Sequence, residues 1–590
     1  MDLQRTTVLL FILALPALLQ GCEPRPTEPA KTPLPGTDEV MDRILEHCRK
    51  NIGTPQIRQI TNRVWVATGY DLANTVILKA GEGYVVVDPG MNAARAGAVR
   101  QDFFKRHKPG PVRAIVYTHS HIDHVGGATA WAGGETRIWA TANFLPHFFK
   151  QYSGFRQIET LRGSRQFGQD VPAGVLPCHG IGRRIDMVAS AKNGVILPDR
   201  SFTGKKVLKF DDLTLELHEA HGETHDQLFV WVPAYSVLIA GDNIYRTFPN
   251  LYTIRGSSPR PVDAWIQSLD HMRRFRAKHL VGNHTLPLSG AAEVARVLRD
   301  YRDTIQWVRD EVVRGANAGL TPDRLAESIR LPDHLRGPWT EEFYGQVDWS
   351  ARAIFSNRLG WFSGDAADLY PVPAGDAARR EVAMMGGDAK VRDAAARALE
   401  EGDQRWALHL LQKLRHSREG KPETMGPGTG DPLEARALEE AGRATLNLNG
   451  RAWLMQAASE IRQGRRPAIQ PVLPEKFVAS IPLSVVFENM AYLLKADEAM
   501  DLHRTISFEF TDLKTTWFLT IRRGILQVTL DTPLPDSPPP AATLMVHSLE
   551  FKKLLFGARN PVQALAGGDL KIRGSWLDFI GFLRHFKLQP

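Results

Sequence analysis

The feature that most constrains the fold of this chain is an apolar run that leads directly into a cluster of histidines. The run Ala114–Tyr117 has the β-branched and aromatic composition of a buried strand, and it continues into THSHIDH, which contains His119, His121, Asp123 and His124. Alternate side chains of an extended segment point the same way, so His119 and His121 can hold one ion. Asp123 and His124 lie on the turn beyond and can reach a second ion. Metals roughly 3.5–4 Å apart can share and deprotonate a water molecule near neutral pH, so the motif predicts a two-metal site.

Short strand-like runs separated by turns surround this motif, with helical segments between them. The strand-like runs are Val64–Val66, Thr75–Leu78, Tyr84–Val87, Lys206–Leu208, Leu213–Leu217, Leu228–Val232 and Val237–Ala240. Helical periodicity marks Ala264–Arg276 and Ala291–Asp310. Strands with interspersed helices predict an α/β layered domain.

The rest of the chain changes character twice, and 590 residues are too many for one hydrophobic core. From about Asp323 the strand-like runs disappear, and Asp388–Arg415 and Pro432–Arg462 have helical periodicity on either side of the Gly- and Pro-rich loop Glu419–Asp431. From about Pro474 the alternation typical of strands returns, and an amphipathic helical segment ends the chain. The pattern predicts an all-α helical domain followed by a small α+β domain.

The N-terminus has the pattern of an export signal. Arg5 precedes the apolar run Val8–Leu19, which has the length of a signal-peptide core and is too short to span a bilayer. The run ends in LQGC, which resembles a bacterial lipobox, so residues 1–22 are predicted to be a lipoprotein signal peptide with lipidation at Cys22. Lipoproteins retained in the inner membrane usually have Asp directly after the lipidated Cys, whereas this chain has Glu23. The protein is therefore predicted to be anchored in the outer membrane, with its folded domains in the periplasm. Ordinary secretion is the alternative. Residues 23–50, which begin with a Pro-rich stretch, are predicted to form a tether.

Composition narrows the expected partners. The net charge of +8 is spread along the chain without a block of Lys or Arg, so nucleic-acid binding is not expected. Membrane contact is expected only through the lipid at Cys22. The other cysteines, Cys48 and Cys178, could pair in an oxidising compartment, but their places in the sequence do not show that they meet.

The HxHxDH pattern of residues 119–124 resembles the signature of the metallo-β-lactamase superfamily, whose αββα sandwich completes its metal site from later strand ends. Candidate ligands follow in the expected order within Gly222-Glu223-Thr224, Ala240-Gly241-Asp242 and Gly282–Pro287, the last of which contains His284. Glu223 in place of the usual histidine narrows the resemblance to the alkyl sulfatase branch. The segments Phe248–Gly256, Tyr301–Asp303 and Leu359–Phe362 are also similar to that branch.

The resemblance implies a full set of site residues. One metal would be held by His119, His121 and Glu223, the other by Asp123, His124 and His284, with Asp242 between them. Zinc is the expected ion because imidazole and carboxylate both suit it, and the high oxygen content keeps Mn and Fe as alternatives. Arg255 matches the sulfate-binding arginine of the branch. That role suits an arginine, because its planar guanidinium can donate hydrogen bonds to two oxygens of a sulfate. Asp123, Asp242 and Arg255 would be the catalytic residues.

The resemblance also implies the domain order and the function. Residues 51–320 would be the catalytic domain, 321–464 a helical dimerisation domain of a homodimer, and 465–590 a sterol-carrier-protein-like domain. The expected activity is cleavage of the sulfate ester of an alkyl chain, a small anionic substrate, by a metal-bound hydroxide. Hydrolysis of another ester, such as a phosphodiester or lactone, is the first alternative. A lipid-binding lipoprotein with an idle catalytic domain is the second.

Several positions depart from the alkyl sulfatase pattern. Phe167 stands where a sulfate-contacting tyrosine is expected, and a phenyl ring cannot donate that hydrogen bond. No histidine that could act as a proton donor follows shortly after Arg255-Gly256. Asp242 has a shorter side chain than the usual glutamate. His221 and His225 lie close enough to Glu223 in sequence to be rival metal ligands.

Overall fold

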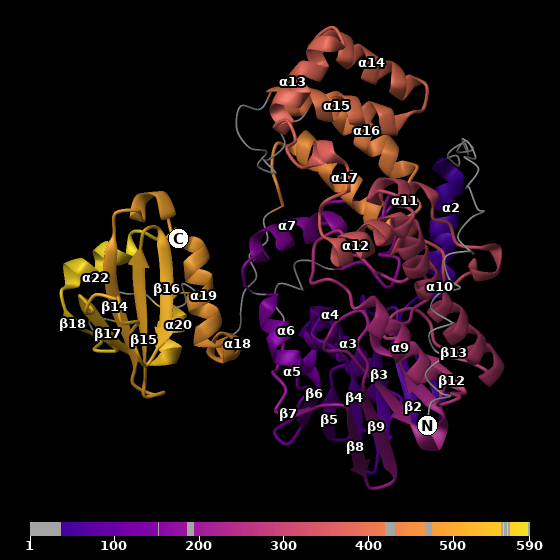
Figure 1. Cartoon of the computed structure of the whole chain (residues 1–590). Helices are drawn as coiled ribbons and strands as arrows, with labels where there is room; N and C mark the ends of the chain where they lie inside the picture. Colours follow the sequence, from indigo (N-terminus) through magenta and orange to yellow (C-terminus); the bar gives the residue numbers. More distant parts are fainter. Residues whose placement is uncertain are drawn as a thin grey trace, which may run out of the picture.

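The computed structural model describes residues 37–151, 153–185, 194–418, 431–467, 475–555, 559, 563, 564 and 567–587 (Figure 1). The predicted signal peptide with Cys22, the Pro-rich start of the tether, and the loop Glu419–Asp431 except its last residue lie outside the described residues. Among the residues described, no helix combines the length and the apolar character needed to cross a membrane.

Two β-sheets lie face to face in the first domain. The first sheet runs in the order β1 (Gln56–Thr61), β2 (Val64–Thr68), β3 (Thr75–Ala80), β4 (Gly83–Val87), β5 (Val112–Val116), β6 (Arg137–Thr141), β7 (Arg200–Phe202). The second runs β13 (Leu288–Ser289), β12 (His279–Val281), β11 (Val237–Ile239), β10 (Leu228–Val232), β9 (Leu213–Glu219), β8 (Lys205–Phe210). Alternating aliphatic residues fill the space between the sheets, with Val66 and Val85 from the first and Leu215 and Val230 from the second.

Helices cover the outer face of each sheet. Helix α3 (Ala93–Phe104) packs Val99 and Phe103 against the first sheet. Helices α9 (Val262–Arg273) and α10 (Ala291–Asn317) cover the second sheet. The four layers confirm the predicted αββα sandwich.

The predicted tether over residues 23–50 is wrong for its second half. Thr37–His47 form helix α2, and Cys48–Ile52 continue it as the π-helical segment η2. Val40 and Ile44 are four residues apart on one face of α2, and both are buried in a hydrophobic cluster with the rest of the protein. This amphipathic spacing, rather than the Pro-rich composition upstream, decides the structure of the segment.

A disulfide bond joins Cys48 to Cys178, with their Cα atoms 6.0 Å apart. The bond connects η2 to a loop of the first domain that is 130 residues away in sequence. The hydrophobic cluster around it also contains Phe343 and Leu448, so the N-terminal helix is held against two parts of the chain at once.

The described part of the helical domain contains, after α11 (Pro322–Ser328) and α12 (Val347–Leu359), the helices α13 (Ala374–Met384), α14 (Asp388–Glu400), α15 (Gln404–Arg418), α16 (Pro432–Arg443) and α17 (Leu448–Gln463). Each of the two predicted helical stretches is in fact a pair of helices. Gly402, with a φ of 77°, ends α14 in the left-handed conformation that favours glycine. Asn447 begins α17 by accepting a hydrogen bond from the backbone N–H of Gly450 at 3.0 Å.

The helical domain is tied to the first domain on two sides. Helices α11 and α12 share their hydrophobic core with α10, although they lie beyond the predicted boundary at residue 320. Helix α17 packs against α7 (Arg156–Gln166), where Arg165 Nη2 lies 2.6 Å from Glu460 Oε2. Figure 1 shows α13–α16 stacked beyond this contact.

The last domain is a five-stranded sheet with helices, which confirms the predicted α+β domain. Its strands run in the order β16 (Ile525–Leu530), β15 (Thr515–Arg522), β14 (His503–Phe510), β17 (Ala542–Val546), β18 (Leu570–Gly574), and its helices are α18 (Glu475–Ser480), α19 (Leu483–Leu493), α20 (Ser548–Leu555) and α22 (Trp576–Leu583). Phe487 of α19 packs on the rings of Phe508 and Phe551. The backbone N–H of Gly154 donates a 3.0 Å hydrogen bond to Asn489 Oδ1, so α19 contacts the first domain.

Candidate metal centre and anion site

Six of the seven predicted ligands follow strands at one edge of the sandwich: His119, His121, Asp123 and His124 after β5, Asp242 after β11, and His284 after β12. Strands β11 and β12 are parallel neighbours, so their ends bring Asp242 and His284 together. The one-turn helix α4 (Ile122–Val125) places Asp123 and His124 beside them. A Cβ atom on Gly126 would lie 1.8 Å from the carbonyl oxygen of Met91, so only glycine fits directly after this helix.

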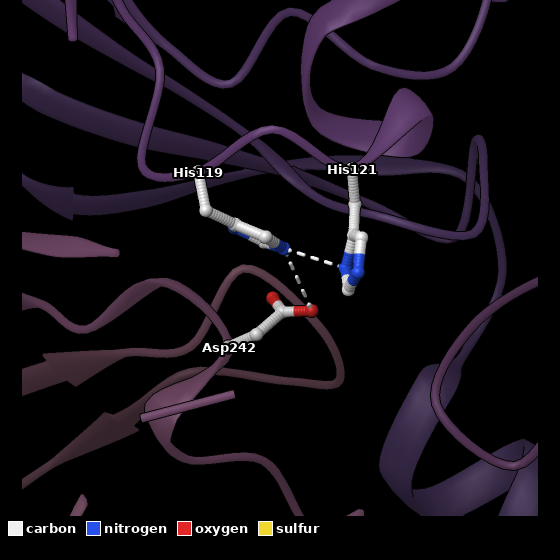
Figure 2. A group of neighbouring side chains, drawn as sticks. All are labelled: His119, His121 and Asp242. Atoms are coloured by element: carbon white, nitrogen blue, oxygen red, sulfur yellow. Dashed lines mark hydrogen bonds and ion pairs between the residues drawn. The ribbon is translucent and has the colours of Figure 1, made fainter. Parts of the chain in front are cut away.

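His119, His121 and Asp242 form the first group of candidate ligands (Figure 2). His119 Nε2 lies 2.8 Å from His121 Nδ1 and 3.7 Å from Asp242 Oδ2. The two imidazoles converge from one extended segment, as their spacing predicts, and the carboxylate approaches them from the second sheet.

Asp123, His124 and His284 form the second group. Asp123 Oδ2 lies 3.4 Å from the Nε2 atom of each histidine. Asp242 Oδ2 is 3.3 Å from His124 Nε2 and 3.0 Å from His284 Nε2. One oxygen of Asp242 therefore faces both groups, which is the position that a bridging carboxylate requires.

Hydrogen bonds on the far side of two imidazoles fix their orientation. His124 Nδ1 lies 2.7 Å from Asp88 Oδ2, and His284 Nδ1 donates to the carbonyl of Leu72 at 2.8 Å. These contacts direct both Nε2 atoms toward the carboxylates. Asp88 ends β4 with a left-handed φ of 53° and also accepts hydrogen bonds from the backbone N–H and the hydroxyl of Thr118. No pattern in the sequence singles out Asp88, and the structure places it in direct contact with His124.

The charges of these groups fit a pair of divalent cations. Burial alone would lower the pKa of His124, but the carboxylates of Asp242, Asp123 and Asp88 raise it well above its usual value. His124 Nε2 and Asp242 Oδ1 are both buried, and neither has a hydrogen-bond partner among the described residues. Such atoms are costly to bury unless they bind a cation, and imidazole with carboxylate suits divalent metals.

Glu223 lines the same cavity but belongs to neither group. Its Oε1 accepts a hydrogen bond from Asn250 Nδ2 at 3.2 Å and lies 3.1 Å from Arg260 Nη2. Its Oε2 is buried and has no hydrogen-bond partner in the described part of the chain. Burial raises the pKa of Glu223 to about 7, against the lowering effect of Arg260. Its part as a ligand stays a prediction, in which Oε2 is the atom that is free to bind.

The rival ligands His221 and His225 also lie outside both groups. His225 Nε2 donates to the carbonyl of Pro259 at 3.0 Å, and its ring stacks on His147 at 5.5 Å. His221 Nε2 lies 3.7 Å from Glu219 Oε1. His221 Nδ1 is also buried without a hydrogen-bond partner among the described residues, as Glu223 Oε2 is, so the choice of Glu223 over its rivals stays a prediction.

Arg255 is held in place at the wall of the cavity. Its backbone N–H donates to Gln166 Oε1 at 3.0 Å, and its Nη1 donates to Thr253 Oγ1 at 3.2 Å. Arg260 lines the same cavity. Burial lowers the pKa of His121 well below its usual value, and the positive charges of Arg255 and Arg260 lower it further, because both guanidinium groups lie nearby.

One cavity of about 1090 Å³ is lined by His121, Asp123, Asp242 and His284 from the ligand groups, together with Glu223, Arg255 and Arg260. Apolar side chains form much of its wall: Ile122, Leu145, Phe149, Phe155, Ile181 and Val485. Phe167 also lines it, so the position of the expected tyrosine faces the cavity without a hydroxyl group. Val485 and Tyr492 belong to α19, so the last domain supplies part of the wall. The cavity can accept an anionic group at the arginines and an apolar chain along its wall.

The sandwich and the ligands at its edge place the chain among the metal-dependent hydrolases of the metallo-β-lactamase superfamily. Residues 68–284 match the family model described as metallo-beta-lactamase superfamily. Residues 321–464 match the model for alkyl sulfatase dimerisation, and residues 472–589 match the alkyl sulfatase C-terminal model.

Known proteins that are similar over most of this chain narrow the class of hydrolase further. A linear primary-alkylsulfatase from Pseudomonas sp. is 31% identical over 87% of this chain and 98% of that protein. An (R)-specific secondary-alkylsulfatase from Pseudomonas sp. is 28% identical over 79% of this chain and 72% of that protein. The solved structure of the stereoselective inverting sec-alkylsulfatase Pisa1 from Pseudomonas sp. matches with a TM-score of 0.83 at 25% identity, covering 91% of this chain and 86% of that one. The chain belongs to the alkylsulfatase family and is an alkyl sulfatase-like hydrolase.

Proposed function

We propose that this enzyme cleaves sulfate esters of alkyl chains with the help of two zinc ions. The proposed ligands are His119, His121 and Glu223 for one ion, Asp123, His124 and His284 for the other, and Asp242 for both. The observation that carries the proposal is the position of Asp242 Oδ2, which faces both ligand groups inside the cavity that Arg255 lines.

Each part of the cavity has a task in this reaction. When bound, the ions would lower the pKa of a water molecule to near neutrality and so supply the nucleophile. Asp123 and Asp242 would accept hydrogen bonds from that water and orient it. Arg255 would hold two oxygens of the sulfate group, which places the ester beside the ligand groups. Phe155 and Val485 would contact the alkyl chain and exclude water from it.

We expect the zinc-loaded enzyme to release sulfate from dodecyl sulfate. The assay measures sulfate release and bound metal together, with a phosphodiester and a lactone as competing substrates. Two bound ions with turnover of only the phosphodiester or the lactone would favour the other-ester hydrolase. A purified chain that binds no metal would favour the idle lipid-binding protein.

We further propose that the enzyme is exported and anchored by a lipid at Cys22, with its body in the periplasm; secretion without an anchor is the alternative. The disulfide between Cys48 and Cys178 supports export, because such bonds persist in oxidising compartments and are rare in the cytosol. Metabolic labelling with a fatty acid, compared between the parent and Cys22→Ala, distinguishes the anchored from the secreted form.

The enzyme is expected to be a homodimer in light scattering at micromolar concentration. Large apolar side chains between the end of α12 and the end of α13 are exposed and suit a subunit interface: Leu359, Trp361, Leu369, Tyr370 and Met384. The double variant Trp361→Glu, Tyr370→Glu should shift the enzyme toward monomer, while Leu145→Glu, which changes an exposed cavity residue instead, should not. A parent chain that stays monomeric at all these concentrations would contradict the proposed dimer.

A further inference from the structure

The backbone directly after the candidate ligand His284 has a conformation that needs support. Thr285 has a left-handed φ of 60°, which is costly for a β-branched residue. Such a conformation persists only where the surrounding structure holds it. Asn74 Nδ2 donates a 2.5 Å hydrogen bond to the carbonyl of Thr285, and the backbone N–H of Arg246 donates to the hydroxyl of Thr285 at 3.1 Å. The contacts that hold Thr285 therefore also fix the direction of His284.

Two further contacts to this backbone come from segments that the disulfide joins. The N–H of Leu286 donates to the carbonyl of Asn51 at 2.8 Å, and the N–H of Thr285 donates to the carbonyl of Ile181 at 3.2 Å. Asn51 lies in η2, and Ile181 lies in the loop 178–182 that the disulfide connects to η2. The disulfide therefore holds together the two segments that accept these hydrogen bonds.

The loop 178–182 also supports the imidazole of His284. A Cβ atom on Gly182 would lie 1.8 Å from the carbonyl oxygen of Leu72, so the loop backbone lies directly against that carbonyl. The same carbonyl accepts the hydrogen bond from His284 Nδ1 at 2.8 Å. The loop thus contacts both the backbone that follows His284 and the group that orients its ring.

His47 connects the loop to η2 a second time. Its Nε2 donates to the carbonyl of Gly180 at 2.6 Å, and its Nδ1 accepts from Asn51 Nδ2 at 2.9 Å. Its ring stacks on Phe343 with centroids 3.9 Å apart. Burial lowers the pKa of His47 to about 4, so the imidazole is neutral near pH 7 and has the one donor and one acceptor that these contacts use.

We propose that the disulfide between Cys48 and Cys178, together with His47, positions the candidate metal ligand His284, so that the second ligand group reaches its full metal affinity only in the oxidised enzyme. The inference rests on the metal ligands of the proposed function and deepens that function by naming a redox control of the same site. When the bond is reduced, η2 and the loop are held together less firmly, and the backbone after His284 loses part of its support. The first group should keep its ion, because its two imidazoles follow β5 in the other sheet.

The bond forms by thiol–disulfide exchange with an external disulfide. A thiolate of one cysteine attacks a sulfur of the external disulfide, and the thiolate of the other cysteine then displaces that sulfur. The two thiols of the enzyme lose two electrons and two protons, and the external disulfide gains both and becomes two thiols. A chain that is exported in the reduced state would therefore gain its full metal affinity after this exchange.

Hydrogen exchange measured by mass spectrometry tests whether the disulfide holds the backbone after His284. The full chain is compared without added metal, before and after reduction by a phosphine. Reduction should remove protection from the peptide that contains Thr285 and Leu286, because their N–H groups donate to the two joined segments. A peptide from β10, a buried strand, is the internal control and should exchange equally in both states. Equal protection of the first peptide in both states would overturn the inference.

Bound metal tests whether this support serves the second ligand group. After dialysis against a chelator, the oxidised enzyme should keep two zinc ions and the reduced enzyme one. The affinity for the ion that is lost should fall by about 10–100-fold, the usual effect of removing a group that orients a ligand. The double variant Cys48→Ser, Cys178→Ser should behave like the reduced enzyme. Retention of both ions with unchanged affinity after reduction would contradict the redox control.

Variants of His47 test the same support while the disulfide is intact. His47→Phe keeps a ring to stack on Phe343 but has no N–H for Gly180, so it should weaken binding of the second ion. His47→Gln has an amide donor and should recover part of that affinity. Val40→Ala is the matched control, because Val40 is buried in the same hydrophobic cluster of α2 and makes none of the contacts described above. It should lower thermal stability and leave metal affinity unchanged. Equal metal loss in Val40→Ala and His47→Phe would overturn the positioning role.

Failure of this inference differs from failure of the proposed function. Two tightly bound ions in both redox states, with sulfate release from dodecyl sulfate, would overturn the inference alone. An oxidised enzyme that binds no ion would overturn both.

Discussion

Asp123→Ala should abolish sulfate release and lower the bound metal content. Asp123 Oδ2 lies within 3.4 Å of two candidate histidine ligands, so its loss leaves His124 and His284 without the carboxylate that completes their group. Removing a partner that merely supports a ligand costs about 10–100-fold in metal affinity or activity, and removing a ligand should cost more than that. Metal content by mass spectrometry and sulfate release from dodecyl sulfate measure both effects.

His121→Ala should behave like Asp123→Ala, because it removes one imidazole of the first group. Asp376→Ala is the matched control, since Asp376 pairs with Arg379 within helix α13, outside both ligand groups. Circular dichroism of all three variants should show that the helical and C-terminal domains still fold. Full activity in either ligand variant would refute the two-metal assignment.

Arg255→Ala should leave both metals bound and slow the reaction strongly. A guanidinium has no lone pair to offer a metal, so metal content reports on the ligands and not on Arg255. Losing a charge-assisted contact to a sheltered anion should cost about 2–5 kcal/mol in transition-state stabilisation, which is well above tenfold in kcat/KM. Arg255→Lys should rescue only part of the activity, because an ammonium keeps the charge but loses the planar fork.

A surface arginine would respond differently to the same two changes. Both substitutions would then leave kcat/KM within about twofold of the parent, far below the estimate for a buried contact. Such a result would remove Arg255 from the anion site. Arg274→Ala is the control, because it removes one positive charge from a residue outside the cavity and should leave kcat/KM unchanged.

The structure brings six of the seven predicted ligands together, and most of the sequence signal for them is local. Four ligands are nearly contiguous, and Asp242 directly follows a strand-like apolar run. Parallel pairing of β11 and β12 then brings Asp242 and His284 together, which only the order of the strands in the sheet determines. That order follows from tertiary packing, so only the family resemblance singles out His284 in the sequence.

Three features of the structure, namely Arg260, Asp88 and helix α2, have no comparably clear pattern in the sequence around them. Arg260 is a single arginine without a periodic neighbour, and its burial is set by how its loop packs over the cavity. Asp88 reads as a turn residue because the sequence does not show that β4 pairs with β5 and ends beside the histidines. For α2, the four-residue spacing of Val40 and Ile44 indicates a helix, but the spacing covers little more than one turn and follows a Pro-rich stretch that favours an extended chain.

The contribution of α19 to the cavity wall has a consequence for protein engineering. Val485 and Tyr492 reach the cavity from the last domain, whereas the candidate metal ligands come from the first. Side chains of this part of the wall can therefore be exchanged without changing the candidate ligands. A library that varies α19, or a chimera that takes this helix from a relative with another chain-length preference, should change substrate range while it preserves the catalytic centre. Removal of the last domain would instead open the cavity to solvent, so a shortened catalyst is not a useful starting point.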